Sequence, residues 1–376
     1  MVDCAKQNNI LWIDYAKFIG IVLVILGHSF QTLRLTDNNL FYNLWQFIYL
    51  FHMPLFFIIA GFLYKHKYSK SNIKKIFYGL FIPYIIYQLI YLPFQLGLYI
   101  TKQHLPLVPT FLKCIIGIFL GDYIDSSISM PVCGPCWFII SIIQLRLLFN
   151  YIKLNFYKAI IISIIAFSLL KLLIFFNIDL FFCLDNTLMA VPYFCFGYIL
   201  KVGYNNINNF ENYTKIFKSI KGCVLNIFVS TITIIMLFLI LKFNGLIQMN
   251  LKISNNLLHK SLILSYIGGI LGTLLVFNIS KIFSQENKFV ALISKNTLFI
   301  IFSHFLLLFI FSWCNIRSFL CYFDNFILKF LYATIISVII LVINYFVINI
   351  IQKVCPILLG KTSIIKTTDI QSISGG

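Results

Sequence analysis

The sequence predicts an all-α fold, a transmembrane bundle of about ten helices with both termini in the cytoplasm. The chain is 60% hydrophobic and 11% charged, with a mean hydropathy of +0.94, which is too apolar for a soluble domain of 376 residues. Apolar runs long enough to cross a bilayer recur along its whole length. Basic residues are concentrated in alternate loops between these runs, as expected for the cytoplasmic side of a membrane protein.

Ten apolar runs are predicted to span the membrane, because each approaches or exceeds the roughly 20 residues that cross a bilayer core. These runs are 11–30, 40–64, 77–100, 137–152, 157–176, 187–203, 220–242, 258–283, 289–313 and 326–352. An eleventh run, 107–121, contains Lys113 and is short, so we expect an interfacial or re-entrant segment there. The chain then divides into a short cytoplasmic N-terminus (1–10), a membrane domain (11–354) and a cytoplasmic C-terminal tail (355–376).

The net charge of +18 does not indicate a nucleic-acid-binding protein. The 29 Lys and Arg residues lie mostly in short loops, as expected where loops face anionic lipid, and no soluble basic domain is present. With the N-terminus in the cytoplasm, most of these residues fall on the inner side, and an even number of spans preserves the bias. The first apolar run lacks a basic segment before it and a cleavage site after it, so we expect it to remain in the protein.

The first predicted helix carries Lys17 near its start and His28 near its end. Eleven residues separate them, which places both side chains on one helix face, roughly 16 Å apart along the axis. Ionisable side chains inside a membrane are costly and usually face a bundle interior or a wet cavity. Lys17 is either a positive-inside anchor, paired with Asp14, or a contact for a cytosolic anion whose reactive end reaches His28. An imidazole can act as a general base toward a hydroxyl, and coenzyme A has the length and the phosphates for such a site.

The second predicted helix contains the motif FHMPLFF at 51–57, followed by Ala60-Gly61-Phe62. Pro54 frees a backbone carbonyl that neighbouring polar groups must satisfy. His52 is therefore either a structural histidine beside a proline kink or a side chain that faces His28 across a cavity.

Three further features within or next to the apolar runs carry polar chemistry. Arg146, in the cytoplasmic half of the fourth span, is either another inside anchor or a phosphate contact, since guanidinium binds phosphate in bidentate fashion. His304 lies in the outer half of the ninth span. Cys133 and Cys136 form a C-x-x-C pattern that opens a membrane helix rather than a soluble strand–helix unit, so a redox role is not expected, and an outward-facing disulfide is the alternative.

Two stretches, WIDYAKFIGIVLVILGHS at 12–29 and FHMPLFFIIAGFLY at 51–64, resemble the opening of the acyltransferase-3 family of integral-membrane acyltransferases. The similarity is closest to the fucose 4-O-acetylase-like subgroup, and it continues more weakly at 136–139 and at 294–298, before His304. Family members commonly have Ser-Gly-Phe where this chain has Ala60-Gly61-Phe62, so a serine hydrogen bond is absent here.

The resemblance implies transfer of an acyl group, usually acetyl, from a cytosolic thioester to a hydroxyl of a carbohydrate or lipid-linked glycan. On the matching positions, His28 is the essential histidine and Lys17 its basic partner. His52 is the second catalytic candidate, and Trp137 and His304 are candidates for lining the substrate site. Direct attack by the acceptor and an acetyl-histidine relay both fit these residues.

We therefore expect an O-acyltransferase of the cell (plasma or inner) membrane that takes acetyl-CoA as donor and a carbohydrate as acceptor, contacts the lipid bilayer and uses no metal. The sequence carries no indication of oligomeric state. A second hypothesis is a multi-pass transporter or flippase for a lipid-linked sugar or small solute, because intramembrane His and Lys residues also serve proton-coupled transport. No convincing internal repeat supports it. A third hypothesis, a glycosyltransferase with a lipid-phosphate donor, generally needs acidic residues near a large outer loop, and the predicted outer loops are short.

Overall fold

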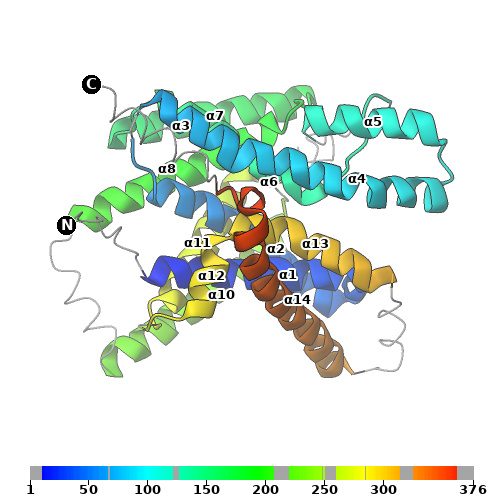
Figure 1. The fold of residues 1–376 in the computed structure, drawn as a ribbon. Helices are drawn as coiled ribbons and strands as arrows, with labels where there is room; N and C mark the ends of the chain where they lie inside the picture. The colour runs from blue at the N-terminus through cyan, green and yellow to red at the C-terminus, as the bar shows by residue number, and fades with distance from the viewer. Residues whose placement is uncertain are drawn as a thin grey trace, which may run out of the picture.

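The computed structural model describes residues 11–66, 68–121, 127–206, 220–247, 249, 260–283, 285–313 and 325–361. All regular secondary structure in these ranges is helical, and Figure 1 shows the helices gathered into one bundle. The α-helices are α1 (Leu11–Thr32), α2 (Asn39–Phe62), α3 (Lys70–Ile76), α4 (Ile82–Gln103), α5 (Leu107–Leu120), α6 (Trp137–Tyr151), α7 (Phe156–Phe176), α8 (Leu184–Asn206), α10 (Ile220–Asn244), α11 (Leu262–Ser280), α12 (Lys288–Lys295), α13 (Thr297–Trp313) and α14 (Phe326–Val354). Shorter elements are the 3-10 helices η1 (Leu35–Asp37), η3 (Gly134–Cys136) and η6 (Pro356–Leu359), and the π-helical turn η2 (Phe77–Phe81).

The predicted polytopic helical bundle is confirmed. Helix occupies each of the ten predicted ranges, although one of them is broken. Within the described ranges, seven helices are long and apolar enough to cross a membrane, and a bent pair of shorter helices makes an eighth candidate. Helix α6 lies where a span was predicted but has only 15 residues. Helix α5, the predicted interfacial or re-entrant segment, has 14 residues, fewer than a span needs.

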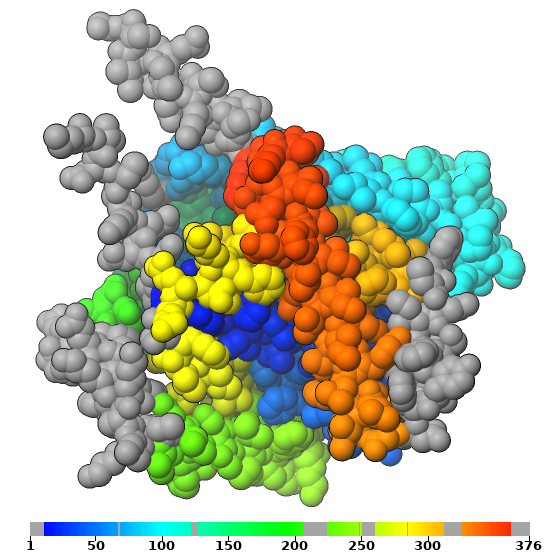
Figure 2. Space-filling model, turned by 60° about the horizontal axis from the view of Figure 1, so that its bottom comes forward, coloured from blue at the N-terminus to red at the C-terminus, as the bar shows by residue number. Residues whose placement is uncertain are grey.

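Helix α1 is central to the bundle, because it contacts α2, α11, α12, α13 and α14. Figure 2 shows its blue atoms between the yellow atoms of the α11–α12 region and the orange atoms of α14. Buried hydroxyl and amide groups link these helices: Ser29 Oγ of α1 lies 3.2 Å from Ser337 Oγ of α14, and Ser303 of α13 donates to Asn344 Oδ1 of α14. Hydrogen bonds between helices supplement van der Waals packing where no water competes for the polar groups.

Helices α2 and α8 approach each other closely at two glycines. A Cβ atom on Gly61 of α2 would lie 1.9 Å from the carbonyl oxygen of Phe194, and one on Gly197 of α8 would lie 2.0 Å from that of Ile58. Small residues allow such close backbone packing, on which membrane helix pairs depend for van der Waals contact. Gly61, which the sequence keeps in its Ala-Gly-Phe motif, is therefore a packing residue.

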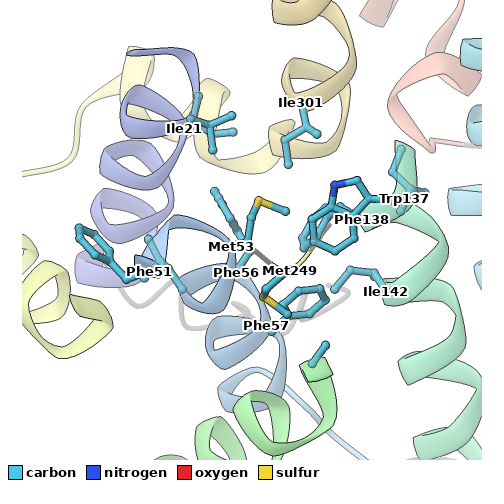
Figure 3. Packing of buried hydrophobic residues seen from close by; sticks show 14 of the residues in the cluster. Ile21, Phe51, Met53, Phe56, Phe57, Trp137, Phe138, Ile142, Met249 and Ile301 are labelled. Atoms are coloured by element: carbon cyan, nitrogen blue, oxygen red, sulfur yellow. The ribbon is translucent and has the colours of Figure 1, made fainter. Parts of the chain in front are cut away.

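Aromatic and aliphatic side chains from α1, α2, α6 and α13 form an apolar core (Figure 3). The ring centroids of Phe57 and Phe138 lie 5.0 Å apart, and Trp137 lies 6.4 Å from Phe57. Met249, which follows α10, is buried in the same core. These contacts fix α6 against α2, and they thereby fix the position of Arg146, which lies further along α6.

The span predicted over 289–313 is wrong as a single helix. It is broken into α12 and α13, whose axes differ by 88°. Asn296 lies at the break with non-helical backbone angles, and its Nδ2 donates to the carbonyl oxygen of Leu292 at 2.7 Å. Asn side chains compete with helical hydrogen bonds in this way, which explains why the break occurs here. The first turn of α13 consequently begins inside the protein.

Residues Lys70–Gln103 form one continuous helical run in which η2 separates α3 from α4. π-helical turns of this kind are frequent at functional sites. The chain after α14 returns to this run, where Tyr87 of α4 donates a hydrogen bond to the carbonyl oxygen of Leu358 in η6. Figure 1 shows η6, in red, next to this helical run, which it contacts at η2 and α4.

Candidate active site

A cavity of about 320 Å³ lies beside Lys17 of α1. Arg146 of α6 and Lys295, the last residue of α12, line it together with Lys17. No Asp or Glu is found among the described residues of its wall. The nearest carboxylate, Asp14, lies behind the wall: it interacts electrostatically with Lys17 and accepts a hydrogen bond from Ser294, which lines the cavity. Three cations against one carboxylate leave an excess of positive charge, which favours an anionic ligand. The structure thus brings together Lys17 and Arg146, the two residues predicted to bind the donor, and it adds Lys295.

The break at Asn296 directs the N-terminal turn of α13 toward the same cavity, since residues 296–299 all line it. The first backbone N–H groups of a helix have no partner within the helix and favour negative charge. Asn296 is 4% exposed, and its Oδ1 accepts no hydrogen bond in the structure. A ligand with both an anionic group and an N–H donor would satisfy the helix N-terminus and this buried acceptor together.

His28, at the other end of α1, is held by a short chain of hydrogen bonds. Its Nδ1 lies 3.0 Å from Tyr49 Oη, and Tyr49 donates its own proton to Gln31 Oε1 at 2.6 Å. Nε2 lies further from the same phenol oxygen, at 3.4 Å, so Nδ1 is the better partner. Because the Tyr49 proton is used on Gln31, the phenol oxygen accepts from His28 Nδ1, and the lone pair of a neutral imidazole is then on Nε2. This tautomer is assigned from the heavy-atom partners. His28 is half-buried and Gln31 is exposed, so this side of the cluster is open.

His304 of α13 packs directly against His28, with ring centroids 5.2 Å apart. It is fully buried, and its Nδ1 lies 2.7 Å from the carbonyl oxygen of Ile300. A carbonyl can only accept, so Nδ1 carries the proton, and Nε2 is a bare acceptor with no partner in the structure. A buried acceptor left unpaired costs about 1–3 kcal/mol, which indicates a role other than stability.

His52 shares a contact with His28: both imidazoles pack against the ring of Tyr49. The ring of His52 is 4.5 Å from that of Tyr49, and its Nδ1 lies 3.0 Å from the carbonyl oxygen of Ile48. The two imidazoles and the phenol of Tyr49 thus form one cluster, and a catalytic role for His52 stays a prediction.

Helices α1 and α13 run side by side in the same direction. Lys17 and Lys295 line the cavity at one end, and His28 and His304 are in contact at the other. The separation of Lys17 and His28 along α1 is roughly 16 Å. The predicted placement of these two residues on one helix face is consistent with a single ligand that reaches from the cavity to the histidines.

The other candidates occupy different places. Trp137 is 7% exposed and packs in the apolar core rather than in the lining of the cavity. Cys133 and Cys136 are buried thiols that form no disulfide in the structure, so the alternative of a disulfide is not realised. Asp14 accepts a hydrogen bond from Ser294 Oγ at 3.0 Å, which links α1 to α12. In the part of the chain that the structure describes, no group of three His, Cys, Asp or Glu residues could hold a metal ion.

Sequence reasoning missed Tyr49, Gln31 and Lys295. Gln31 follows His28 by three residues and Tyr49 precedes His52 by three, which is helical neighbour spacing and was the available signal. Lys295 lies in the polar interruption Ser-Lys-Asn within an otherwise apolar run. The interruption belongs to the motif at 294–298, but hydropathy alone does not show that the helix breaks there.

Together, the bundle and its site define a multi-pass membrane protein with a cationic cavity and a histidine cluster at opposite ends of one helix. Comparison with known families assigns it: residues 10–349 match the acyltransferase domain of the acyltransferase-3 family, and the chain belongs to this family. The family is one of integral-membrane acyltransferases, as the resemblance of residues 12–29 and 51–64 implied.

The chain is also similar to two proteins named nodulation protein NolL. It is 41% identical over 63 residues to that of Sinorhizobium fredii, covering 16% of this chain and 17% of that protein. It is 44% identical over 59 residues to that of Mesorhizobium japonicum, covering 15% and 16%. The chain thus matches about one sixth of the length of these relatives. No solved structure matches it.

Proposed function

We propose that the protein transfers an acetyl group from acetyl-CoA to a hydroxyl of a cell-surface or lipid-linked carbohydrate in the cell membrane. The observation that carries the proposal is that one helix, α1, contributes Lys17 to a cationic cavity and His28 to a histidine cluster that is open on one side. Membership of an acyltransferase family supports the reaction class. Acetyl is the proposed acyl group because it is the one that the family resemblance implies.

The proposed donor site is the cavity beside Lys17. The phosphates of CoA would contact Lys17, Arg146 and Lys295. Each of these cations can donate charge-assisted hydrogen bonds to phosphate oxygens. Pantetheine carries amide N–H groups that could pair with Asn296 Oδ1. Its thioester end would then extend along α1 and α13 toward His28.

In the proposed reaction, His28 Nε2 takes the proton of the acceptor hydroxyl while the hydroxyl oxygen attacks the thioester carbonyl. The C–S bond breaks, and the acyl group passes to that oxygen. The protonated imidazole returns its proton to the leaving thiolate, so the products are CoA thiol and a carbohydrate ester. His52 and Tyr49 would hold His28, and Trp137 and His304 remain candidates for contacts with the acceptor.

The test is incorporation of radioactive acetyl from acetyl-CoA into membrane glycan by cells that express the protein. We expect His28→Ala to reduce incorporation by about 10²–10⁴-fold, the usual contribution of a general base. His66→Ala is the matched control, because His66 is an exposed histidine bonded only to nearby Tyr64.

Two results would contradict the proposal. Unchanged incorporation in His28→Ala would show that His28 is not the general base. Absence of acetyl incorporation by the wild-type protein would show that it does not catalyse the proposed reaction. Movement of a lipid-linked sugar across vesicles without release of CoA thiol would favour the transporter hypothesis instead.

A further inference from the structure

The described end of the chain, residues 355–361, contributes to the cavity although it lies beyond the family match at 10–349. After α14, the chain turns into η6, and Leu359 and Gly360 then form part of the cavity wall. The sequence assigned these residues to a cytoplasmic tail. This segment therefore adds residues to the cavity from outside the range that the family match covers.

The segment is anchored at two points. Tyr87 Oη of α4 donates to the carbonyl oxygen of Leu358, and the Tyr87 ring itself lines the cavity. Gly360 has a positive φ of 68°, and a Cβ atom on it would lie 2.3 Å from the carbonyl oxygen of Gly79 in η2. Only glycine fits this combination of backbone angle and close approach. Both anchors are specific, so η6 is a fixed wall of the cavity.

The segment also carries a cation to the edge of the cavity. Lys361 directly follows Gly360 of the cavity wall, and its backbone N–H donates to the carbonyl oxygen of Pro356 at 3.0 Å, so η6 fixes where it lies. Its side chain is exposed beside the cavity, and partial desolvation, followed by repulsion from Lys295, lowers its pKa from the ordinary value. Lys17 and Arg146 line the same cavity as Lys295. Four cations in one region repel each other, and an anion bound among them relieves that repulsion.

We propose that residues 356–361 complete the donor site, with η6 as its wall and Lys361, beside Lys295, as a contact for a phosphate of the CoA donor. This inference rests on the proposed function. A lipid headgroup carries the same phosphate chemistry, and the choice of donor in the experiment separates the two sources.

The experiment compares Lys361→Gln with Lys353→Gln in the purified full-length protein. Lys353 is exposed near the end of α14, so its variant removes the same charge without touching the cavity. The KM is measured for acetyl-CoA and for S-acetylpantetheine, which lacks the phosphates, and the Kd is measured for CoA. We expect Lys361→Gln to raise the KM for acetyl-CoA and the Kd for CoA about 5- to 20-fold, as for loss of one charge-assisted hydrogen bond. The KM for S-acetylpantetheine and all constants of Lys353→Gln should stay unchanged.

A second variant, Gly360→Ala, tests the wall. It should raise the KM for both donors, because the segment can no longer dock on Gly79, whereas Gly97→Ala, at a glycine with nothing within 4 Å, should not. The role of Lys361 is overturned if Lys361→Gln has the same constants as Lys353→Gln, which is the result expected if Lys361 contacts only lipid headgroups. It is also overturned if Lys361→Gln raises the KM for both donors equally. If the wild-type protein binds no CoA, the proposed function itself fails. If the wild-type protein binds CoA and the variants bind it equally well, only the role of residues 356–361 is overturned.

Discussion

His28 Nδ1 lies 3.0 Å from Tyr49 Oη, compared with 3.4 Å for Nε2, and the shorter contact decides which imidazole nitrogen carries the proton. Since Tyr49 gives its proton to Gln31, the phenol accepts from His28 and leaves Nε2 as the basic atom. The arrangement resembles the general pattern in which a base is oriented by a second group that fixes its tautomer. Tyr49 is therefore a positioning residue in this site.

Tyr49→Phe should lower kcat roughly 10-fold, because it removes the hydrogen bond that orients His28 while it keeps the ring that packs against His52. The KM for acetyl-CoA should change little, since Tyr49 is remote from the cavity. Tyr42→Phe on the same helix is the control, because Tyr42 is exposed. A Tyr49→Phe protein with wild-type kcat would show that His28 needs no such support.

The unpaired Nε2 of His304 predicts a variant that separates stability from activity. His304→Leu removes a buried acceptor without a partner, so the thermal midpoint of unfolding in detergent should stay constant or rise. The acyl transfer rate should nevertheless fall at least about 10-fold if this nitrogen accepts a hydrogen bond from the acceptor or from His28 during the reaction. Full activity in His304→Leu would show that the histidine only fills space.

The spans and the Lys17–His28 pair were predictable because they depend on local quantities, hydropathy along the chain and spacing along one helix. The partners of these residues were not. Tyr49 is one aromatic residue among many in an apolar run, and only the packing of α2 on α1 selects it. Lys295 reaches the cavity because the helix breaks at Asn296, and hydropathy alone favoured one continuous span there. Leu359 and Gly360 come to the cavity through a tertiary contact with α4 that no local pattern records.

The cavity predicts a KM effect without a large kcat effect. Lys17→Gln and Arg146→Gln should each raise the KM for acetyl-CoA about 10- to 100-fold, because each removes a charge-assisted contact to phosphate. The KM for S-acetylpantetheine should change much less. Lys75→Gln is the control, since Lys75 is an exposed cation in α3 outside the cavity lining. Equal KM values for Lys17→Gln and Lys75→Gln would mean that Lys17 is only a membrane anchor.

The close approach of α2 and α8 predicts that Gly61 is sensitive to any added side chain. A Cβ atom there would lie 1.9 Å from the carbonyl oxygen of Phe194, and that backbone atom belongs to a helix that cannot yield by a rotamer change. Gly61→Val should therefore lower the free energy of unfolding by at least about 1–3 kcal/mol, the usual cost of overpacking, or prevent assembly of the bundle. Gly97→Val in α4, where nothing lies within 4 Å of the added Cβ, controls for the effect of valine on a helix. Thermal stability by fluorescence-detected gel filtration in detergent measures both. If the two variants had the same midpoint, the α2–α8 contact would have to be looser than the structure describes, and the position of His52 on α2 would no longer be fixed from that side.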